Sequence, residues 1–379
     1  MAKLKITYPT YRQPPHVTFG TGCLRTLAEL EAFERTAFFL SGQATVRSYL
    51  EGVLAKQGLG LDSSQVITKP PGEPTATMIS AGAELLRGRE FAAIVGIGGG
   101  SVLDWCRLSW ASAAGLLDVE SGKLQSLSHG TTRPAFWLVP STCATGAEAA
   151  DVAVYSSDGR KVPVVSPHLL ADRVLLDARF LESLSLGLLA QSLCDALSHA
   201  IEGFVSLVPI AMAKEAAVSA LRLILQYYAA EAGPSRFERL MDAAYLGGVA
   251  ASNCSVGVTH AFAHTMARYG VPHALGNALG LEAGIRLNAE TPAMAQLLAR
   301  MHWKSVTELL AAVRPIIRDA LDGVTIDEVL DPLAKPAERA STVEAMLADV
   351  CIRTNPRRLA AEDIERFLED VQRTAQETR

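Results

Sequence analysis

The first half of the chain alternates short, continuously apolar runs with stretches of helical pattern, and this alternation limits the folds open to it. Runs rich in β-branched and aromatic residues occur at Thr36–Ser41, Phe91–Ile97, Ala135–Pro140 and Arg173–Asp177. A strand that is apolar on both faces must be covered on both faces, as in a parallel sheet with helices packed on either side. The pattern up to about residue 185 therefore predicts an α/β domain with a parallel sheet.

The second half has a different pattern. From Leu186 onwards, long helical patterns rich in Ala and Leu dominate, with few β-branched runs and few turn clusters, as in Ala211–Gln226. A chain of 379 residues is long enough for two packed domains. We therefore expect an α/β domain over residues 1–185, followed by an all-α domain over residues 186–379.

Charge, cysteine content and hydropathy narrow the class of partner. The chain has 35 basic and 40 acidic residues, a net charge of −5 without a basic block, which disfavours nucleic acid and anionic membrane as partners. Six scattered cysteines without a C-x-x-C pair indicate reduced thiols. Residues 1–9 lack the apolar region of a signal peptide, and no apolar run reaches the roughly 18 residues of a membrane span. We expect a soluble, cytoplasmic protein with a small-molecule ligand.

Two polar loops follow apolar runs of the first half. The first comprises Gly98, Gly99, Gly100 and Ser101, with Ser101 as a candidate helix N-cap. Glycines let the backbone approach an anion closely, and helix N-termini bind phosphate, although the spacing fits no standard fingerprint and a plain turn would have the same composition. The second, Pro140–Glu148, carries the hydroxyl groups of Ser141, Thr142 and Thr145. Two such loops beyond strand ends favour a dinucleotide site.

Histidines and an aspartate in the second half indicate a metal site. Asp195 and His199 are four residues apart, so a helix places both on one face, although an isolated pair of this kind is more often solvated. His260 and His264 share another helical face, and His273 follows a Gly-Val-Pro turn that can fold the chain back. Imidazoles with one carboxylate suit Zn²⁺ or Fe²⁺, whereas Mg²⁺ and Ca²⁺ prefer oxygen. We favour a metal site over unrelated histidines.

These segments together resemble the iron-containing (group III) alcohol dehydrogenase family over nearly the whole chain. The family's G-G-G-S-x-x-D loop is matched by Gly98–Asp104, its P-T-T-x-G-T-G-S-E loop by Pro140–Glu148, and its D-A-x-x-H-A-I-E helix by Asp195–Glu202. Its H-A-x-A-H segment and its P-H pair are matched by His260–His264 and Pro272–His273. The resemblance implies a dinucleotide-binding domain followed by a helical domain, with metal and nicotinamide meeting in the cleft.

The resemblance also implies roles for individual residues. The metal ligands would be Asp195, His199, His260 and His273, with His264 near the nicotinamide but not on the metal. Cofactor contacts would come from Gly42, Gly98, Gly99, Gly100, Ser101, Ser141, Thr142, Thr145 and Lys161. The chain departs from the family pattern at Arg107, where a lysine is usual, and at Ser141, Ala144, Ala147 and Leu193-Cys194. These departures affect cofactor detail and substrate more than the metal ligands.

The implied activity is that of an NAD(P)H-linked alcohol dehydrogenase or aldehyde reductase of small substrates, containing Fe²⁺ or Zn²⁺ and forming a homodimer. Hydride would pass between nicotinamide C4 and a carbonyl carbon whose oxygen the metal polarises. His264 would either relay the proton or make only a supporting hydrogen bond. Gly42 stands where NAD-preferring relatives have an aspartate, so no carboxylate would repel a 2′-phosphate, and we expect NADPH to be accepted.

Three alternatives stay open. Arg268 lies between the metal histidines, and Arg353, Arg357 and Arg358 cluster near the end, which would suit an anionic aldehyde such as phosphonoacetaldehyde. A non-redox lyase resembling dehydroquinate synthase shares the two-domain plan, but the D-A-x-x-H and H-A-x-A-H pattern disfavours it. A catalytically silent protein that only binds cofactor is the third.

Overall fold

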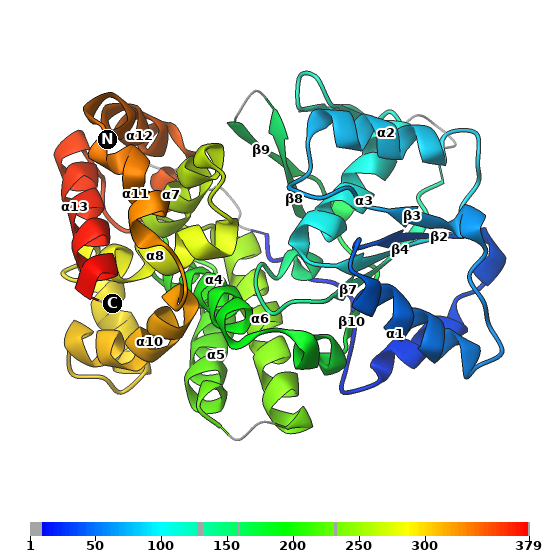
Figure 1. Cartoon of the computed structure of the whole chain (residues 1–379), viewed down its shortest axis with the longest axis horizontal. Helices are drawn as coiled ribbons and strands as arrows, with labels where there is room; N and C mark the ends of the chain where they lie inside the picture. The colour runs from blue at the N-terminus through cyan, green and yellow to red at the C-terminus, as the bar shows by residue number, and fades with distance from the viewer. Residues whose placement is uncertain (1–9, 127–131, 158–159, 231–232, 378–379) are drawn as a thin grey trace. The chain divides into compact units, whose positions relative to one another are not determined.

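The computed structural model describes residues 10–126, 132–157, 160–230 and 233–377 (Figure 1). It contains two compact units. One, the α/β unit, comprises Gln13–Leu184 and Ala230–Tyr245. The other, the helical unit, comprises Ser185–Ala229 and Leu246–Arg379 together with the N-terminal segment up to Arg12. Residues 1–9, on which the expectation about a signal peptide rests, lie outside the described residues. No helix of the described part combines the length and the apolar character that crossing a bilayer requires.

The α/β unit is built on a six-stranded sheet whose paired strands are all parallel, in the order β1-β10-β7-β4-β2-β3. This confirms the predicted fold class. Two small antiparallel hairpins, β5-β6 and β8-β9, accompany the sheet. The strands are β1 His16–Phe19, β2 Thr36–Leu40, β3 Val66–Thr68, β4 Ala93–Gly98, β5 Leu117–Asp118, β6 Lys123–Leu124, β7 Ala135–Pro140, β8 Val152–Ser157, β9 Arg160–Val165 and β10 Arg173–Leu176.

The strand order has a topological switch point at the carboxyl ends of β2 and β4. From β2 the chain crosses to β3 on one side, and from β3 it returns to β4 on the other side of β2. Ligands of open α/β sheets bind at such a switch point, outside the carboxyl ends of the strands. The segments that leave β2, β4 and β7 at this edge begin with Ser41, Gly99 and Ser141. They include both polar loops identified in the sequence.

Helices cover both faces of this sheet, because residues along its strands are apolar on both sides. Helix α1 (Ala44–Ala55) lies on one face, and α2 (Ala76–Leu86) and α3 (Gly100–Ala113) on the other (Figure 1). Phe38 joins the core beneath α1, which includes Leu50, whereas its neighbour Phe39 packs edge-on against Trp105 of α3, with ring centroids 4.9 Å apart. Successive strand residues thus serve opposite faces.

In the described part of the helical unit, every regular element is a helix, as the second half of the sequence predicts. Helix α4 runs through its middle and is buried along almost its whole length from Leu189. It packs against α5, α8 and α10. The helices are α4 Leu186–Val205, α5 Ala211–Tyr228, the C-terminal part of α6 Pro234–Cys254, α7 Val258–Met266, α8 His273–Leu287, α9 Pro292–Arg300, α10 Val306–Leu321, α11 Ile326–Ala334, α12 Pro336–Ala348 and α13 Ala361–Glu377, with a 3₁₀ turn at Val350–Thr354.

Candidate active site

Three helices of the helical unit bring one carboxylate and two imidazoles together. Asp195 comes from α4, His260 from α7 and His273 from the first turn of α8. One ligand atom from each lies within 4.8 Å of the others. The Oδ1 oxygen of Asp195 is 3.4 Å from the Nε2 nitrogen of His260 and 3.5 Å from that of His273. These three residues, separated by up to 78 positions in the chain, form one polar cluster in which Asp195 and His260 are buried and His273 is partly exposed.

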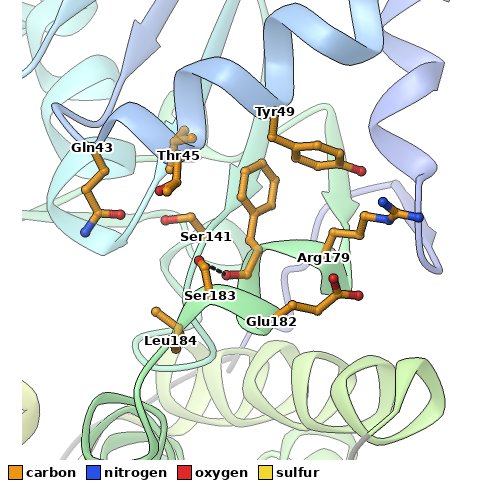
Figure 2. Close-up of a pocket in the computed structure, with 10 residues that line it drawn as sticks. Gln43, Thr45, Tyr49, Ser141, Arg179, Glu182, Ser183 and Leu184 are labelled. Carbon is orange, nitrogen blue, oxygen red and sulfur yellow. Dashed lines mark hydrogen bonds between the residues drawn. The ribbon is translucent and has the colours of Figure 1, made fainter.

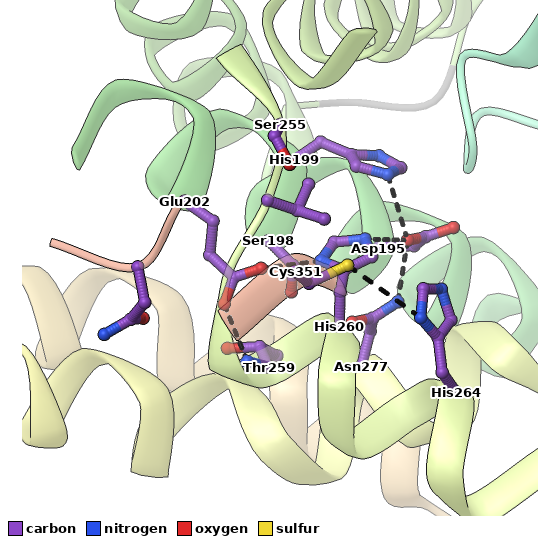
Figure 3. A network of polar contacts seen from close by, with 12 residues as sticks. Asp195, Ser198, His199, Glu202, Ser255, Thr259, His260, His264, Asn277 and Cys351 are labelled. Carbon is purple, nitrogen blue, oxygen red and sulfur yellow. Dashed lines mark hydrogen bonds and ion pairs between the residues drawn. The ribbon is translucent and has the colours of Figure 1, made fainter. Parts of the chain in front are cut away.

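His199 lies at the edge of this cluster. The helical spacing predicted that it shares a face with Asp195, and its Nε2 nitrogen is 3.8 Å from Asp195 Oδ1. Its ring stacks on that of His260, with centroids 4.5 Å apart (Figure 3). The three closest ligand atoms, however, belong to Asp195, His260 and His273. All four expected ligands are therefore gathered in one place, with His199 slightly further out.

The unpaired atoms of this cluster test whether a cation fits there. Among the described residues, five buried side-chain polar atoms have no hydrogen-bond partner. Four of them are Asp195 Oδ2, His199 Nδ1, His260 Nε2 and Asn277 Oδ1. Buried polar groups are nearly always paired, so their concentration at one point indicates a missing ligand. A carboxylate and imidazoles are the donors that Zn²⁺ and Fe²⁺ accept, and the residues present fit such an ion.

Burial and neighbouring charge set the protonation of this cluster. Burial lowers the pKa of His199 to about 3, which leaves its ring neutral, the form in which imidazole binds metals. Burial alone would also lower the pKa of His260, but its contacts with Asp195 and Glu202 raise it to about 9. Burial opposes the ionisation of Asp195, but the surrounding imidazoles hold its pKa well below the ordinary value. Metal binding at His260 would therefore release a proton.

Asn277 joins the cluster although nothing in its sequence context singled it out. It is fully buried on α8, one turn after His273. Its Nδ2 group donates a hydrogen bond to Asp195 Oδ1 at 2.8 Å and lies 3.2 Å from His273 Nε2. The four-residue spacing from His273 was the available signal, but that spacing only makes two helix residues neighbours and does not indicate a metal site.

His264 belongs to a second cluster on the other side of His273. Its ring stacks on that of His273, with centroids 5.4 Å apart, and its Nδ1 nitrogen lies 3.0 Å from Asp349 Oδ2. Cys351 is the third member, with Sγ 3.9 Å from the same nitrogen. In contrast to the first cluster, none of its buried side-chain atoms is without a hydrogen-bond partner. The three side chains are close enough to share a cation, but their contacts form a hydrogen-bonded group that holds the His264 ring.

The two polar loops of the α/β unit meet at the start of α3. A Cβ atom added at Gly99 would lie 3.7 Å from Thr142 Oγ1, and one at Gly100 would overlap Thr145. The helix begins at Gly100 with Gly99 as its N-cap, so the expectation that Ser101 caps it is wrong. Because Gly98 has no side chain, Val102 of the first turn packs directly over it. No side chain caps this N-terminus, which leaves its N–H groups available to an anion.

A pocket of about 290 Å³ opens beside the carboxyl ends of β2 and β7. Figure 2 shows Gln43, just before α1, and Thr45 and Tyr49 of α1 on one side of it, with Arg179, Glu182 and Ser183 of the segment after β10 on the other. The lining also includes Ser141, one of the expected cofactor contacts. Gly42 precedes Gln43, and its neighbourhood is open enough that an added Cβ would make only ordinary contact, 3.6 Å from the carbonyl oxygen of Lys69.

Lys161 lies on β9, in the β8–β9 hairpin. Its ammonium group pairs with the carboxylate of Glu73. Burial lowers the pKa of Lys161 to about 8. The expected cofactor contact is therefore a partly buried, ion-paired lysine that does not belong to the six-stranded sheet.

Arg107, the departure from the family lysine, is a structural residue. It is fully buried, and its guanidinium group donates to the carbonyl oxygens of Leu103, Ala150, Val152 and Leu169 and to Asp104 Oδ1. A planar group with five donors can satisfy all of these acceptors at once, whereas an ammonium group cannot. Arg107 therefore ties α3 to the segments around β8.

The arginines proposed for an anionic substrate have other partners or face solvent. Arg268 is exposed, stacks on Tyr269 and donates to Ser341 and Thr342. Arg357 pairs with Asp363. Arg353 and Arg358 are exposed. None of these contacts connects them to the cluster around Asp195, and the anionic-aldehyde hypothesis stays a prediction.

Comparison with known proteins places the chain among alcohol dehydrogenases. Residues 14–178 match the iron-containing alcohol dehydrogenase family, and residues 189–372 match the C-terminal part of the Fe-containing alcohol dehydrogenase family. The chain is 30% identical to a probable alcohol dehydrogenase, EutG, of Salmonella typhimurium over 92% of this chain and 91% of that protein. It is 29% identical to the 1-propanol dehydrogenase PduQ of the same organism, over 79% and 83%.

A solved structure has the same fold. The iron-containing alcohol dehydrogenase of Thermococcus thioreducens superposes with a TM-score of 0.82 at 21% identity, covering 96% of this chain and all of that one.

Proposed function

Because the chain belongs to the iron-containing alcohol dehydrogenase family and is an oxidoreductase acting on alcohols, we propose that it interconverts a small alcohol and its aldehyde with an NAD(P) cofactor and a divalent metal ion. One observation carries this proposal. Three helices bring imidazoles around Asp195, and several buried polar atoms of this cluster have no hydrogen-bond partner. A purely structural polar cluster would have its atoms paired.

The metal would be held by Asp195, His199, His260 and His273. When bound, the ion supplies Lewis acidity towards a carbonyl oxygen, and the nicotinamide supplies or accepts the hydride. Asp195 contributes the negative charge of the site, and His199 is held neutral by burial, ready to donate a lone pair. Fe²⁺ and Zn²⁺ both suit these donors, and the reconstitution below compares them.

The dinucleotide would be held by the α/β unit. Gly98, Gly99 and Gly100 let its pyrophosphate approach the uncapped N-terminus of α3, where Ser101, Thr142 and Thr145 add hydroxyl groups. The pocket lined by Gln43, Tyr49 and Ser141 would receive the adenosine end, because it adjoins the switch point of the sheet. Lys161 would contact the cofactor from β9. Gly42 leaves room for the 2′-phosphate of NADPH.

His264 would hold or move the proton of the reaction. Asp349 accepts from its Nδ1 nitrogen, so its other ring nitrogen is the one available for exchange with substrate, water or the cofactor ribose. In this proposal, residues 1–185 act as the dinucleotide-binding domain and residues 186–379 as the metal and substrate domain. The working form would be a cytoplasmic homodimer. Size-exclusion chromatography with light scattering tests the dimer, and subcellular fractionation tests the location.

Reconstitution followed by a substrate screen tests the proposal. The protein is purified anaerobically, stripped of metal, and reloaded with Fe²⁺ or Zn²⁺. Oxidation of NADPH and NADH is then followed by absorbance across a panel of neutral and phosphonate-bearing aldehydes. The proposal expects metal-dependent turnover of at least one aldehyde and its loss in His260→Ala. Phosphate release from a sugar-phosphate acid without net cofactor turnover would support the lyase, and cofactor binding without turnover of any carbonyl would support a silent binding protein.

A further inference from the structure

Glu202 occupies the N-terminus of a helix to which it does not belong. It is buried on α4, and its Oε1 oxygen accepts a hydrogen bond from the backbone N–H of Thr259 at 2.6 Å. Thr259 lies in the first turn of α7, and Gly257, the N-cap of that helix, provides no capping side chain. The first N–H groups of a helix lack partners within it and favour a negative charge. From the neighbouring helix, the carboxylate of Glu202 supplies both a hydrogen-bond acceptor and a negative charge.

The other oxygen of the same carboxylate reaches a proposed metal ligand. Glu202 Oε2 lies 2.7 Å from the Nδ1 nitrogen of His260 (Figure 3). The Oε1 oxygen of this carboxylate already accepts the Thr259 N–H, so the group acts as a hydrogen-bond acceptor in this position. An ionised carboxylate only accepts hydrogen bonds, so Nδ1 must carry a hydrogen. The opposite nitrogen, Nε2, is the unpartnered atom that faces Asp195.

Close packing fixes the carboxylate in this position. A Cβ atom at Gly257 would lie 3.0 Å from Glu202 Oε1 and 2.9 Å from Asn355 Oδ1, tighter than side chains ordinarily pack. Asn355 is itself held by a reciprocal pair of amide hydrogen bonds with Asn288, of 3.0 and 3.1 Å. Glycine at position 257 therefore gives Glu202 the space to reach both Thr259 and His260.

We propose that Glu202 is a positioning residue for metal binding, whose carboxylate holds His260 as the Nδ1–H tautomer and so directs the lone pair of Nε2 to the ion. This inference rests on the proposed metal site. Carboxylates behind ligating histidines have this effect in metal sites generally. Glu202 touches neither the ion nor the substrate, and its effect is therefore on affinity for the metal.

The substitution Glu202→Gln separates positioning from space filling, because it keeps shape and size. The glutamine side chain has only one acceptor oxygen, which can serve Thr259 N–H or His260 Nδ1–H but not both. If its amide group faces His260, Nδ1 becomes the acceptor and the hydrogen moves to Nε2, where it blocks the metal. If its oxygen faces His260, the neutral amide accepts the Nδ1–H more weakly than the carboxylate did, so the tautomer is held less firmly, and the start of α7 loses its cap. We expect the Zn²⁺ affinity to fall roughly 10- to 100-fold.

The readout is the dissociation constant of Zn²⁺, measured by competition with a chromophoric chelator and without any turnover. ¹⁵N-histidine spectra of the Zn²⁺-loaded protein report which ring nitrogen of His260 carries the hydrogen. The matched control is Glu282→Gln, which removes another buried carboxylate of the helical unit, one that pairs with Arg286 and Arg314. We expect Glu282→Gln to bind Zn²⁺ as the unmodified protein does.

A second variant decides the matter if Glu202→Gln does not fold. Gly257→Ala keeps the carboxylate but pushes it away from Thr259 and His260, and should weaken Zn²⁺ binding in the same direction. Unchanged Zn²⁺ affinity in folded Glu202→Gln, or in Gly257→Ala where Glu202→Gln is unfolded, would overturn the inference. Failure of the unmodified protein to bind Zn²⁺ or Fe²⁺ would instead remove the proposed metal site, and with it the function on which the inference rests.

Discussion

The Nδ1 nitrogen of His264 lies 3.0 Å from the Oδ2 oxygen of Asp349, which comes from a turn 85 residues further along the chain. The other oxygen of Asp349 accepts from the backbone N–H of Cys351 at 2.8 Å. One carboxylate thus fixes the start of the Val350–Thr354 turn and the orientation of the imidazole to which we assign the proton. The geometry parallels that of Glu202 with Thr259 and His260.

Replacing Asp349 by Asn should impair the chemical step more than substrate binding. The asparagine has one acceptor oxygen for two donors, so it loses either His264 or the Cys351 N–H. The ring of His264 is then either held more weakly in the same tautomer, by a neutral acceptor, or turned to the opposite tautomer by the amide NH₂ group. We expect kcat to fall about 10-fold with little change in KM, measured in the steady state with saturating cofactor. Asp363→Asn, at the start of α13 and remote from His264, is the control and should keep kcat. An unaltered kcat in Asp349→Asn would show that Asp349 does not position His264 for the reaction.

Introducing a carboxylate at Gly42 should reverse the expected acceptance of NADPH. The backbone there is free of positive φ, and an added Cβ atom would lie no closer than 3.6 Å to any neighbour, so the position suits a residue with a side chain. Its charge would repel the 2′-phosphate, and we expect kcat/KM for NADPH to fall at least about 10-fold relative to NADH. Gly42→Asn has the same size without the charge and should retain the original ratio. A strong preference of the unmodified enzyme for NADH would contradict the expectation.

Arg107→Lys should destabilise the α/β unit, although lysine is usual at this position in the family. The ammonium group cannot reach the carbonyl oxygens of Ala150, Val152 and Leu169 together, so buried acceptors are left unpaired. We expect a loss of about 2 to 4 kcal/mol in the free energy of unfolding, measured by urea denaturation. The same change at Arg47, which is exposed, should have little effect. Equal stability of both variants would show that the hydrogen bonds of Arg107 do not stabilise the packing of α3 against the segments around β8.

The buried Glu148 should make stability depend on pH. Burial raises its pKa from the ordinary 4.5 to about 7. Since the unfolded chain ionises at the lower pH, the folded state is favoured below about pH 4.5, and this contribution is lost as the pH rises through about 7. Between about pH 5 and pH 8, the free energy of unfolding should fall less in Glu148→Gln than in the unmodified protein, by up to about 3 kcal/mol. If the free energy of unfolding depends on pH in the same way in both proteins, Glu148 does not contribute to the pH dependence.

The sequence predicts the fold well where burial is continuous. The runs at Ala135–Pro140 and Thr36–Ser41 became β7 and β2, almost to the residue, because both faces of these strands are covered. The sequence does not predict strand β1, because its residues are at most partly buried and form no apolar run. Ala230–Tyr245 belongs to the α/β unit although its helical pattern resembles that of its surroundings, since packing partners are not visible in a local pattern.

In the candidate site too, local spacing predicts some residues, and others are revealed only by the fold. Helical spacing placed Asp195 and His199 on one face, and the pairing of α7 with α8 brought His260 and His273 to them. The supporting residues were harder to predict, because their partners are distant in the chain. Glu202 stood one turn beyond His199, but only the fold reveals that it caps α7. Asp349 gave no signal in the sequence.

Anomalous diffraction from crystals of the Fe²⁺- or Zn²⁺-loaded protein, collected at the absorption edge of the metal, tests the central claim most directly. We expect one strong peak in the helical unit, about 2.0 to 2.2 Å from atoms of Asp195, His199, His260 and His273, with His264 outside bonding distance. A peak between His264, Asp349 and Cys351, or a peak anywhere else outside bonding distance of Asp195, His199, His260 and His273, would contradict the proposed metal site.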